Sequence, residues 1–238
     1  HLPPSLEYII LTYHEGQPLE HLTHTLQKQG RTVYLETTSV DQARRGEQIG
    51  VDGVIAKGHE AGGYVGDETT FILLQQYLHE ESIPVFAHGG IGLHTVGACR
   101  VAGAGVVLDS QLALARESTL PDTIKSRIAL MDGSETICLG GLLGERYRVY
   151  SRPDCLAVES LRQEEVRLMA EHLPVEEILK RWRALVHPCI GWDSVKTNVL
   201  PIGQDAAFAA SLAKRYLTVG GIIEGIRCSS EEHTRIIG

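Results

Sequence analysis

The sequence lacks a cluster of basic residues, and its 238 residues carry a net charge of −8. This excess of negative charge disfavours nucleic acids and anionic membrane surfaces as main binding partners. Apolar runs long enough to cross a membrane are also lacking, and no signal peptide is recognisable. We therefore expect a cytoplasmic protein that binds neither nucleic acid nor membranes.

Paired cysteines and metal-binding motifs are lacking as well. The five cysteines are widely spaced, odd in number and include no Cys-x-x-Cys pair, so they predict reduced thiols in small apolar roles. No Gly-x-Ser-x-Gly segment surrounds Ser110 or Ser134, which leaves a serine hydrolase unsupported. His21 and His24 share one helical face without a third ligand nearby, so we predict no metal site.

The chain does contain short apolar runs that alternate with helix-like stretches. The runs are continuously apolar, which is typical of strands buried on both faces of a parallel sheet. They cover residues 8–13, 32–35, 53–56, 84–87 and 105–108. Helices are predicted over residues 19–29, 39–49, 68–79 and 94–102, with Ser39 as an N-cap. This spacing indicates consecutive βα units and an α/β fold.

The character of the sequence changes after about residue 116. Amphipathic helices are predicted over residues 118–131, 159–172, 174–186 and 205–218, the third beginning at Pro174. In this half of the chain, residues 147–150 resemble a short strand. We predict a parallel-sheet domain over residues 1–118 and a mainly helical extension over residues 119–238 that packs on it.

Strand-linked glycines recur at Gly62-Gly63, at Gly89-Gly90 and within residues 103–110. Glycine after a parallel strand lets the backbone approach a phosphate group, and the helix that follows presents free N–H groups. One such pair is more often a tight turn, but the recurrence favours a phosphate site at this edge of the sheet. Glu60 is predicted to close the first glycine turn by hydrogen bonds.

Three segments resemble the flavin-dependent nitronate monooxygenases, formerly called 2-nitropropane dioxygenases, and the related FMN-dependent enoyl-acyl-carrier-protein reductases. They read Gly-His-Glu-Ala-Gly-Gly-Tyr-Val-Gly over residues 58–66, Ile-Pro-Val to Gly-Gly-Ile over residues 83–91, and Gly-Ala-Gly-Val-Val to Leu-Asp-Ser over residues 103–110. Residues 112–118 and Gly203-Gln204 are also similar. The match is most specific over residues 32–118. The residues at its variable positions resemble those of reductase modules in polyketide and polyunsaturated-fatty-acid synthases.

The resemblance implies a (β/α)8 TIM barrel in which the five predicted strands are strands four to eight. The first three strands would be absent from this chain, which starts at His1 rather than at Met. We therefore expect a piece of a longer polypeptide, whose N-terminal barrel segment is a partner of this one. Open barrel edges would otherwise favour self-association into oligomers.

The resemblance also implies the residues of an FMN site. Backbone N–H groups of Gly89, Gly90, Ile91 and of Asp109, Ser110, Gln111 would bind the phosphate, where a barrel's last two strands generally hold one. Gly62 and Gly63 would lie beside the flavin ring or its ribityl chain. Lys57 and His88 end two strands on the same side and would face the cofactor, with a purely structural role as the alternative for both.

Two positions depart from the family's pattern. Tyr64 replaces its catalytic histidine, and a phenol with a pKa near 10 is mainly a proton donor. Tyr64 therefore suits protonation of a reduced enoyl substrate, while a structural aromatic is the equal alternative. Asp109 replaces a glycine, and its carboxylate would repel a nearby phosphate by about 1–4 kcal/mol unless it points away.

The resemblance thus implies an FMN-dependent oxidoreductase of fatty acid or polyketide biosynthesis. NAD(P)H would reduce the flavoprotein, which would then reduce the double bond of an enoyl thioester on an acyl carrier protein or domain. The alternative reaction is that of a nitronate monooxygenase. The non-catalytic alternative is a degenerate scaffold module of a megasynthase.

Overall fold

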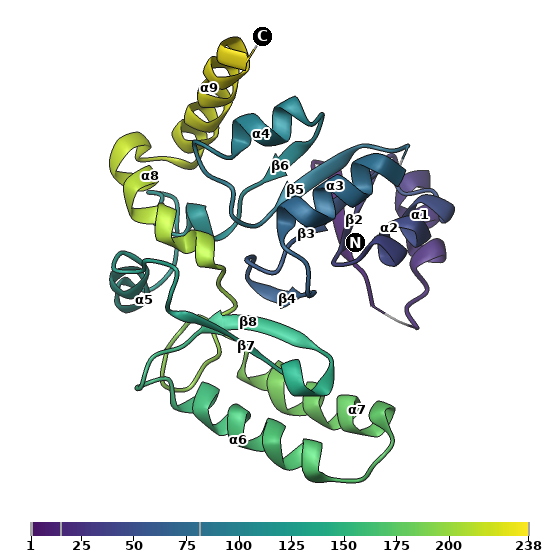
Figure 1. The fold of residues 1–238 in the computed structure, drawn as a ribbon, viewed down its shortest axis with the longest axis vertical. Coiled ribbons are helices and arrows are strands. Elements are labelled where there is room, and N and C mark those ends of the chain that lie inside the picture. The colour runs from purple at the N-terminus through teal and green to yellow at the C-terminus, as the bar shows by residue number, and fades with distance from the viewer. Residues whose placement is uncertain (1, 15, 81, 238) are drawn as a thin grey trace.

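The computed structural model describes residues 2–14, 16–80 and 82–237, and it contains a five-stranded parallel sheet. The strand order is β1-β2-β3-β5-β6, and every neighbouring pair is parallel. The bounds are β1 Tyr8–Thr12, β2 Thr32–Thr37, β3 Gly53–Lys57, β5 Val85–His88 and β6 Gly105–Val107. All five predicted strands are therefore confirmed, and the chain has an α/β fold (Figure 1).

Helices connect these strands as predicted. Their bounds are α1 Leu19–Lys28, α2 Val40–Gln48, α3 Thr70–Glu80 and α4 Val96–Val101. Ser39 is the N-cap of α2, because its side-chain oxygen accepts the backbone N–H of Gln42. Glu60 also acts as predicted, since its carboxylate accepts the backbone N–H of Thr70 at the start of α3.

A second, antiparallel sheet lies below the first in Figure 1, with the strand order β4-β8-β7. Its strands are β4 Gly63–Val65, β7 Thr136–Leu139 and β8 Arg146–Tyr150. The predicted strand at residues 147–150 is confirmed as part of β8. The strand β7 was not predicted, and it pairs along four residues of β8. Pairing of β4 with β8 fastens the Gly62-Gly63 segment to the C-terminal half.

Residues 119–237 of the described chain contain five helices, and four of them lie where the sequence predicts helices. Their bounds are α5 Asp122–Ile128, α6 Leu156–Ala170, α7 Val175–Val186, α8 Ala209–Tyr216 and α9 Val219–Ile237. The long helix α9 was not predicted. It returns to the parallel sheet and packs against α4, where Ile222 and Ile226 join the core of that sheet. Short 3-10 helices cover Ser110–Leu112 (η1), Gly141–Leu143 (η2), His187–Cys189 (η3) and Gln204–Phe208 (η4).

Two buried apolar clusters stabilise the two layers. One joins the parallel sheet to its helices and includes Leu35, Val54 and Leu73. The other joins β7 and β8 to α6 and α7 and includes Leu139 and Trp182. Because β4 and β8 pair across residue 118, the division of the chain into two domains at that point stays a prediction.

The parallel sheet is open in the part of the chain that the structure describes, with β1 and β6 as its edge strands. A closed barrel therefore stays a prediction. Among the same residues, none of the helices combines the length and the apolar character needed to span a bilayer.

Candidate functional site

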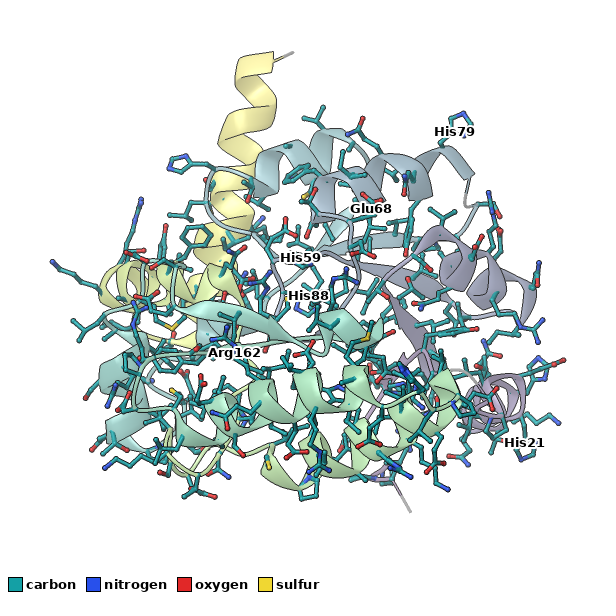
Figure 2. The ribbon with its side chains drawn as sticks, turned by 60° about the horizontal axis from the view of Figure 1, so that its bottom comes forward. His21, His59, Glu68, His79, His88 and Arg162 are labelled. Atoms are coloured by element: carbon teal, nitrogen blue, oxygen red, sulfur yellow. The ribbon has the colours of Figure 1, made fainter. Side chains whose placement is uncertain are left out.

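Charged side chains stand at the carboxyl ends of four neighbouring strands. Glu36 belongs to β2, Lys57 ends β3, His88 ends β5, and Asp109 follows β6. Lys57 and His88 are direct partners in the β3–β5 pairing, so the register itself brings their side chains together. Figure 2 shows His88 near the centre of the molecule, whereas His21 lies at its outer edge.

These four residues form a chain of opposite charges, which we call the charge ladder. Nζ of Lys57 lies 3.0 Å from Oε1 of Glu36, and Nδ1 of His88 lies 3.3 Å from Oε2 of the same carboxylate. Nε2 of His88 lies 3.8 Å from Oδ2 of Asp109. The side chains of Lys57 and His88 are 8% and 5% exposed, while that of Asp109 is 54% exposed. Two buried cationic groups are thus bridged by Glu36, and Asp109 closes the ladder at the surface.

The ladder fixes the charge of its members. Burial alone would raise the pKa of Glu36, but His88 and Lys57 lower it to about 2. Burial would lower the pKa of His88, but the carboxylates of Asp109 and Glu36 outweigh that effect and raise it. Glu36 is therefore ionised at neutral pH, and protonation of His88 is favoured. The predicted place of Lys57 and His88 at the ligand edge is compatible with this arrangement, and both are also tied to structure through Glu36.

The four glycines of the two pairs meet different surroundings. A methyl group on Gly62 would lie 2.8 Å from the backbone nitrogen of Gly203, and one on Gly89 would lie 2.8 Å from Oγ1 of Thr70. These two positions require glycine for contacts within the chain. Gly90 has a φ of +65°, a conformation that favours glycine. Gly63 is buried but has room for a methyl group, because the atoms nearest to one would lie at van der Waals distances of 3.8–3.9 Å and include Nζ of Lys57.

The loop that follows β6 is held by side chains rather than left open. Oε1 of Gln111 accepts the backbone N–H of Asp109 at 2.8 Å, and Nε2 of Gln111 donates to the carbonyl of Ile91 at 2.9 Å. Oγ of Ser110 accepts the N–H of Gly203 at 3.0 Å. This loop, the Gly89-Gly90 turn and the start of η4 therefore meet at one edge of the sheet, where the sequence predicts a phosphate.

Asp205 and Glu36 belong to this site, and neither was predicted from the sequence. Asp205 is 2% exposed, its Oδ2 accepts Nε2 of Gln111 at 3.0 Å, and burial raises the pKa of its carboxyl to about 6. Glu36 could have been found, because it follows a predicted strand at the same edge as Lys57. Asp205 carries no such signal, since its burial depends on η4 folding back onto a loop 94 residues earlier.

Tyr64 lies on β4 and lines a cavity of about 350 Å³ beneath the carboxyl edge of the parallel sheet. Its ring centroid is 6.0 Å from that of His14, with the two planes tilted by 49°. Burial, assisted by Arg183, lowers the pKa of His14, and burial raises the pKa of Tyr147 to about 12. The cavity therefore combines neutral hydrogen-bonding groups with the ion pair of Arg183 and Glu145. Its other lining residues are Gln17, Trp182, Val186 and His187.

One feature of this edge fits the phosphate of a flavin nucleotide. Gly63 itself is buried, and a methyl group there would lie in ordinary van der Waals contact with Pro201, Tyr147 and Nζ of Lys57. Among the described side chains, Nδ1 and Nε2 of His88 and Oδ1 of Asp205 are buried without a hydrogen-bond partner. The His88 nitrogens face the carboxylates of Glu36 and Asp109, so a protonated ring would place a buried positive charge beside the glycine turn, which suits a phosphate, whereas Oδ1 of Asp205 is an acceptor and would repel one unless the carboxyl is protonated.

Metal ligands do not converge in the structure. Within the described residues, no group of three or more histidine, cysteine, aspartate or glutamate side chains is arranged to hold a metal ion. His21 and His24 lie on α1, and Figure 2 places His21 far from His88. The predicted site residues therefore lie in the charge ladder, in the glycine turns and at the Tyr64 cavity, and not in a metal site.

The sequence profile of the nitronate monooxygenase family matches residues 6–177, which is more than half of the chain. Among curated proteins, a 5-hydroxy-7a-methyl-1-oxo-octahydro-1H-indene-4-carboxyl-CoA dehydrogenase of Rhodococcus jostii is 34% identical over 110 residues, or 45% of this chain and 31% of the relative. A probable nitronate monooxygenase of Staphylococcus aureus is 26% identical over 145 residues, or 56% of this chain and 41% of the relative. The chain thus spans less than half the length of these curated relatives.

The structure of FabK from Thermotoga maritima superposes with a TM-score of 0.74 and 27% sequence identity, covering 96% of this chain and 70% of that one. The match extends beyond the glycine segments to nearly the whole described fold, including the antiparallel sheet and the C-terminal helices. Together with the profile match, this similarity confirms the resemblance read from the three segments. The chain belongs to the nitronate monooxygenase family of flavin-dependent oxidoreductases.

Proposed function

We propose that this chain is the cofactor-binding part of an FMN-dependent oxidoreductase that reduces the double bond of enoyl thioesters. The observation that carries the proposal is the position of Tyr64, which follows Gly63 on β4 and lines the cavity. A phenol there can donate a proton to a substrate held between the cavity and the cofactor. Starting nitronate oxidation needs a base, for which Tyr64 is poorly suited.

FMN, when bound, supplies the hydride chemistry, with NAD(P)H as the reductant. In this proposal the backbone N–H groups of Gly89–Ile91 and of Ser110 and Gln111 hold its phosphate. Gly62 and Gly63 would lie beside its ring, and Nζ of Lys57 lies near Gly63. Asp109 lies beside the phosphate, but its carboxylate faces His88. This pairing reduces the repulsion expected from an aspartate where the family has glycine.

The chain's own residues position the substrate and move the proton. Trp182, Tyr147 and Val186 exclude water from the cavity and contact the acyl part. Tyr64 gives its proton to the α-carbon as the β-carbon receives hydride, and solvent reprotonates the phenolate. Tyr147, whose pKa burial raises to about 12, stays neutral. The relative named as a carboxyl-CoA dehydrogenase supports a thioester substrate, and we propose an acyl carrier protein or domain as its carrier.

The proposal extends to the setting of this chain. We propose that an N-terminal segment of the same polypeptide supplies further strands between the edges of β1 and β6 and completes a barrel, with oligomers as the alternative way to cover these edges. We propose a cytoplasmic synthase of the fatty acid or polyketide type as the parent protein.

The absorption spectrum of the full-length parent protein between about 350 and 500 nm tests the proposal. We expect a flavin spectrum, released FMN, bleaching by NAD(P)H without oxygen, and recovery of the colour on addition of an enoyl thioester. Recovery with a nitronate but not with a thioester would replace the proposal by the monooxygenase reaction. A colourless protein that also fails to bind added FMN would replace it by the scaffold role.

A further inference from the structure

We propose that Glu36 and Asp109 hold His88 as a permanent imidazolium, and that this buried cation admits the phosphate group of FMN beside Asp109. The inference rests on the proposed function, because it names the residue that makes the phosphate end of that site work. It gives Glu36 a positioning role and Asp109 a partner.

The geometry of the His88 ring carries the argument. A neutral imidazole has one N–H donor and one nitrogen with a lone pair. Here Nδ1 faces a carboxylate oxygen of Glu36 at 3.3 Å, and Nε2 faces one of Asp109 at 3.8 Å. In either neutral tautomer, one lone pair would point at a carboxylate with little water to separate them, since the side chain is 5% exposed. A proton on both nitrogens removes this repulsion.

The charged groups around His88 come from four elements. Glu36 on β2 is shared, because its other oxygen binds Lys57 of β3 at 3.0 Å. Asp109 follows β6, and Asp205 of η4 also acts on the ring, because His88 and Asp205 influence each other's charge. Lys57 opposes protonation of His88, whereas the three carboxylates favour it. With Asp205 left aside, two cations balance two carboxylates, so the ladder is neutral before an anion binds.

The consequence concerns the phosphate. Without a proton on His88, Lys57 would still balance Glu36, but a phosphate beside the Gly89-Gly90 turn would face the unbalanced carboxylate of Asp109, and repulsion would disfavour binding. With the proton, Asp109 is already paired and the ring adds a positive charge next to the glycine turn. Buried Asp205 remains as the group whose ionisation weakens anion binding as the pH rises through about 6.

A double-mutant cycle on FMN affinity tests the pairing. We expect His88→Gln to weaken FMN binding at least tenfold and Asp109→Asn to strengthen it about threefold in the wild-type background. In the His88→Gln background, Asp109→Asn should strengthen binding about tenfold, because the carboxylate there is no longer paired. Equal gains in the two backgrounds would overturn the proposal. His79→Gln, on the exposed end of α3, is the matched control and should leave affinity unchanged.

Nitrogen-15 NMR of the histidine rings in the protein without FMN separates this inference from the proposed function. The imidazolium would be supported by protons on both nitrogens of His88 at pH 7.5. It would also require that the Asp109→Asn variant loses one of these protons at a lower pH than the wild type does. A neutral His88 at pH 7.5 would overturn it even if FMN binds. A charged His88 in a protein that binds no FMN would overturn the phosphate role together with the proposed function. These measurements need only wild type and Asp109→Asn, so they stand even if His88→Gln fails to fold.

Discussion

Gly62 and Gly203 meet backbone to backbone, although 141 residues separate them: a methyl group on Gly62 would lie 2.8 Å from the nitrogen of Gly203. The neighbouring hydrogen bond from the N–H of Gln204 to the carbonyl of Glu60 fixes the same contact at 2.9 Å. The glycine pair of the cofactor segment therefore has two separate tasks. Gly62 joins the two halves of the chain, and Gly63, with a φ of +75°, adopts the left-handed conformation at the start of β4.

Gly62→Ala and Gly63→Ala should accordingly fail in different ways. We expect Gly62→Ala to destabilise the protein by about 3 kcal/mol through overpacking against backbone, and to speed hydrogen exchange at Gln204. Gly63→Ala should cost about 1 kcal/mol, because Gly63 has a φ of +75° but room for a methyl group. Urea unfolding and hydrogen exchange measure both effects. Unchanged exchange at Gln204 in Gly62→Ala would contradict the joining role.

Glu36→Gln should destabilise the protein far more than the same substitution at an exposed glutamate that also pairs with a basic side chain. The change leaves Lys57 and His88 buried without their common anion, and breaking a buried pair in this way costs about 3–5 kcal/mol. Glu159→Gln, which removes a half-exposed partner of Arg162 on α6, is the control and should change stability by less than about 0.5 kcal/mol. Urea unfolding at pH 7 compares the two variants, and equal losses would argue against a structural role for the ladder.

The unfolding free energy at acidic pH should depend on the titration of Glu36. Its pKa in the folded protein is about 2, below the ordinary value of 4.5. Its contribution is therefore fully present above pH 4.5 and is lost as the pH falls toward 2. We expect the difference in unfolding free energy between wild type and Glu36→Gln to shrink over this range. A difference that stays constant from pH 5 to pH 2.5 would contradict the lowered pKa of Glu36.

Asp205 should act with the opposite sign. Its folded-state pKa of about 6 lies above its ordinary value of 3.8, so the folded protein holds this proton more tightly and loses stability as the pH rises from 4 to 6. Asp205→Asn should therefore stabilise the protein at pH 8, by at most about 3 kcal/mol, and less at pH 4. Unfolding in urea at the two pH values measures this change. A stabilisation that is the same at both would show that burial of charge is not its cause.

The sequence predicted the parallel sheet well because each of its strands is encoded locally. Continuous apolar runs such as residues 53–56 need no distant partner to be recognised. The antiparallel sheet was predicted only at β8, because β4 is three residues long and its pairing with β8 depends on a contact between segments about 80 residues apart. The helix α9 was missed although its apolar face, with Ile222 and Ile226, packs on the parallel sheet's core.

Site residues that lie at the ends of the parallel strands could be predicted from the sequence. Site residues that come from segments distant in the sequence could not. Lys57, His88 and Asp109 could be assigned to one edge because parallel strands end together. Their mutual pairing through Glu36 could not, since Asp109 alone predicts repulsion of a phosphate and only the register shows His88 beside it. Asp205 reaches the site through η4, and no local pattern marks a buried aspartate.

Tyr64→Phe should separate proton donation from the other steps of the proposed reaction. If Tyr64 protonates the substrate, the variant should still bind FMN and accept hydride from NAD(P)H at the wild-type rate, while reoxidation by an enoyl thioester slows by about 100-fold or more. Tyr147→Phe is the matched control, because it removes a second phenol from the same cavity, and it should slow reoxidation by less than tenfold. Stopped-flow absorbance of the flavin, without oxygen, follows both half-reactions. Equal rates of reoxidation in wild type and Tyr64→Phe would assign the proton to water and make Tyr64 a structural wall of the cavity.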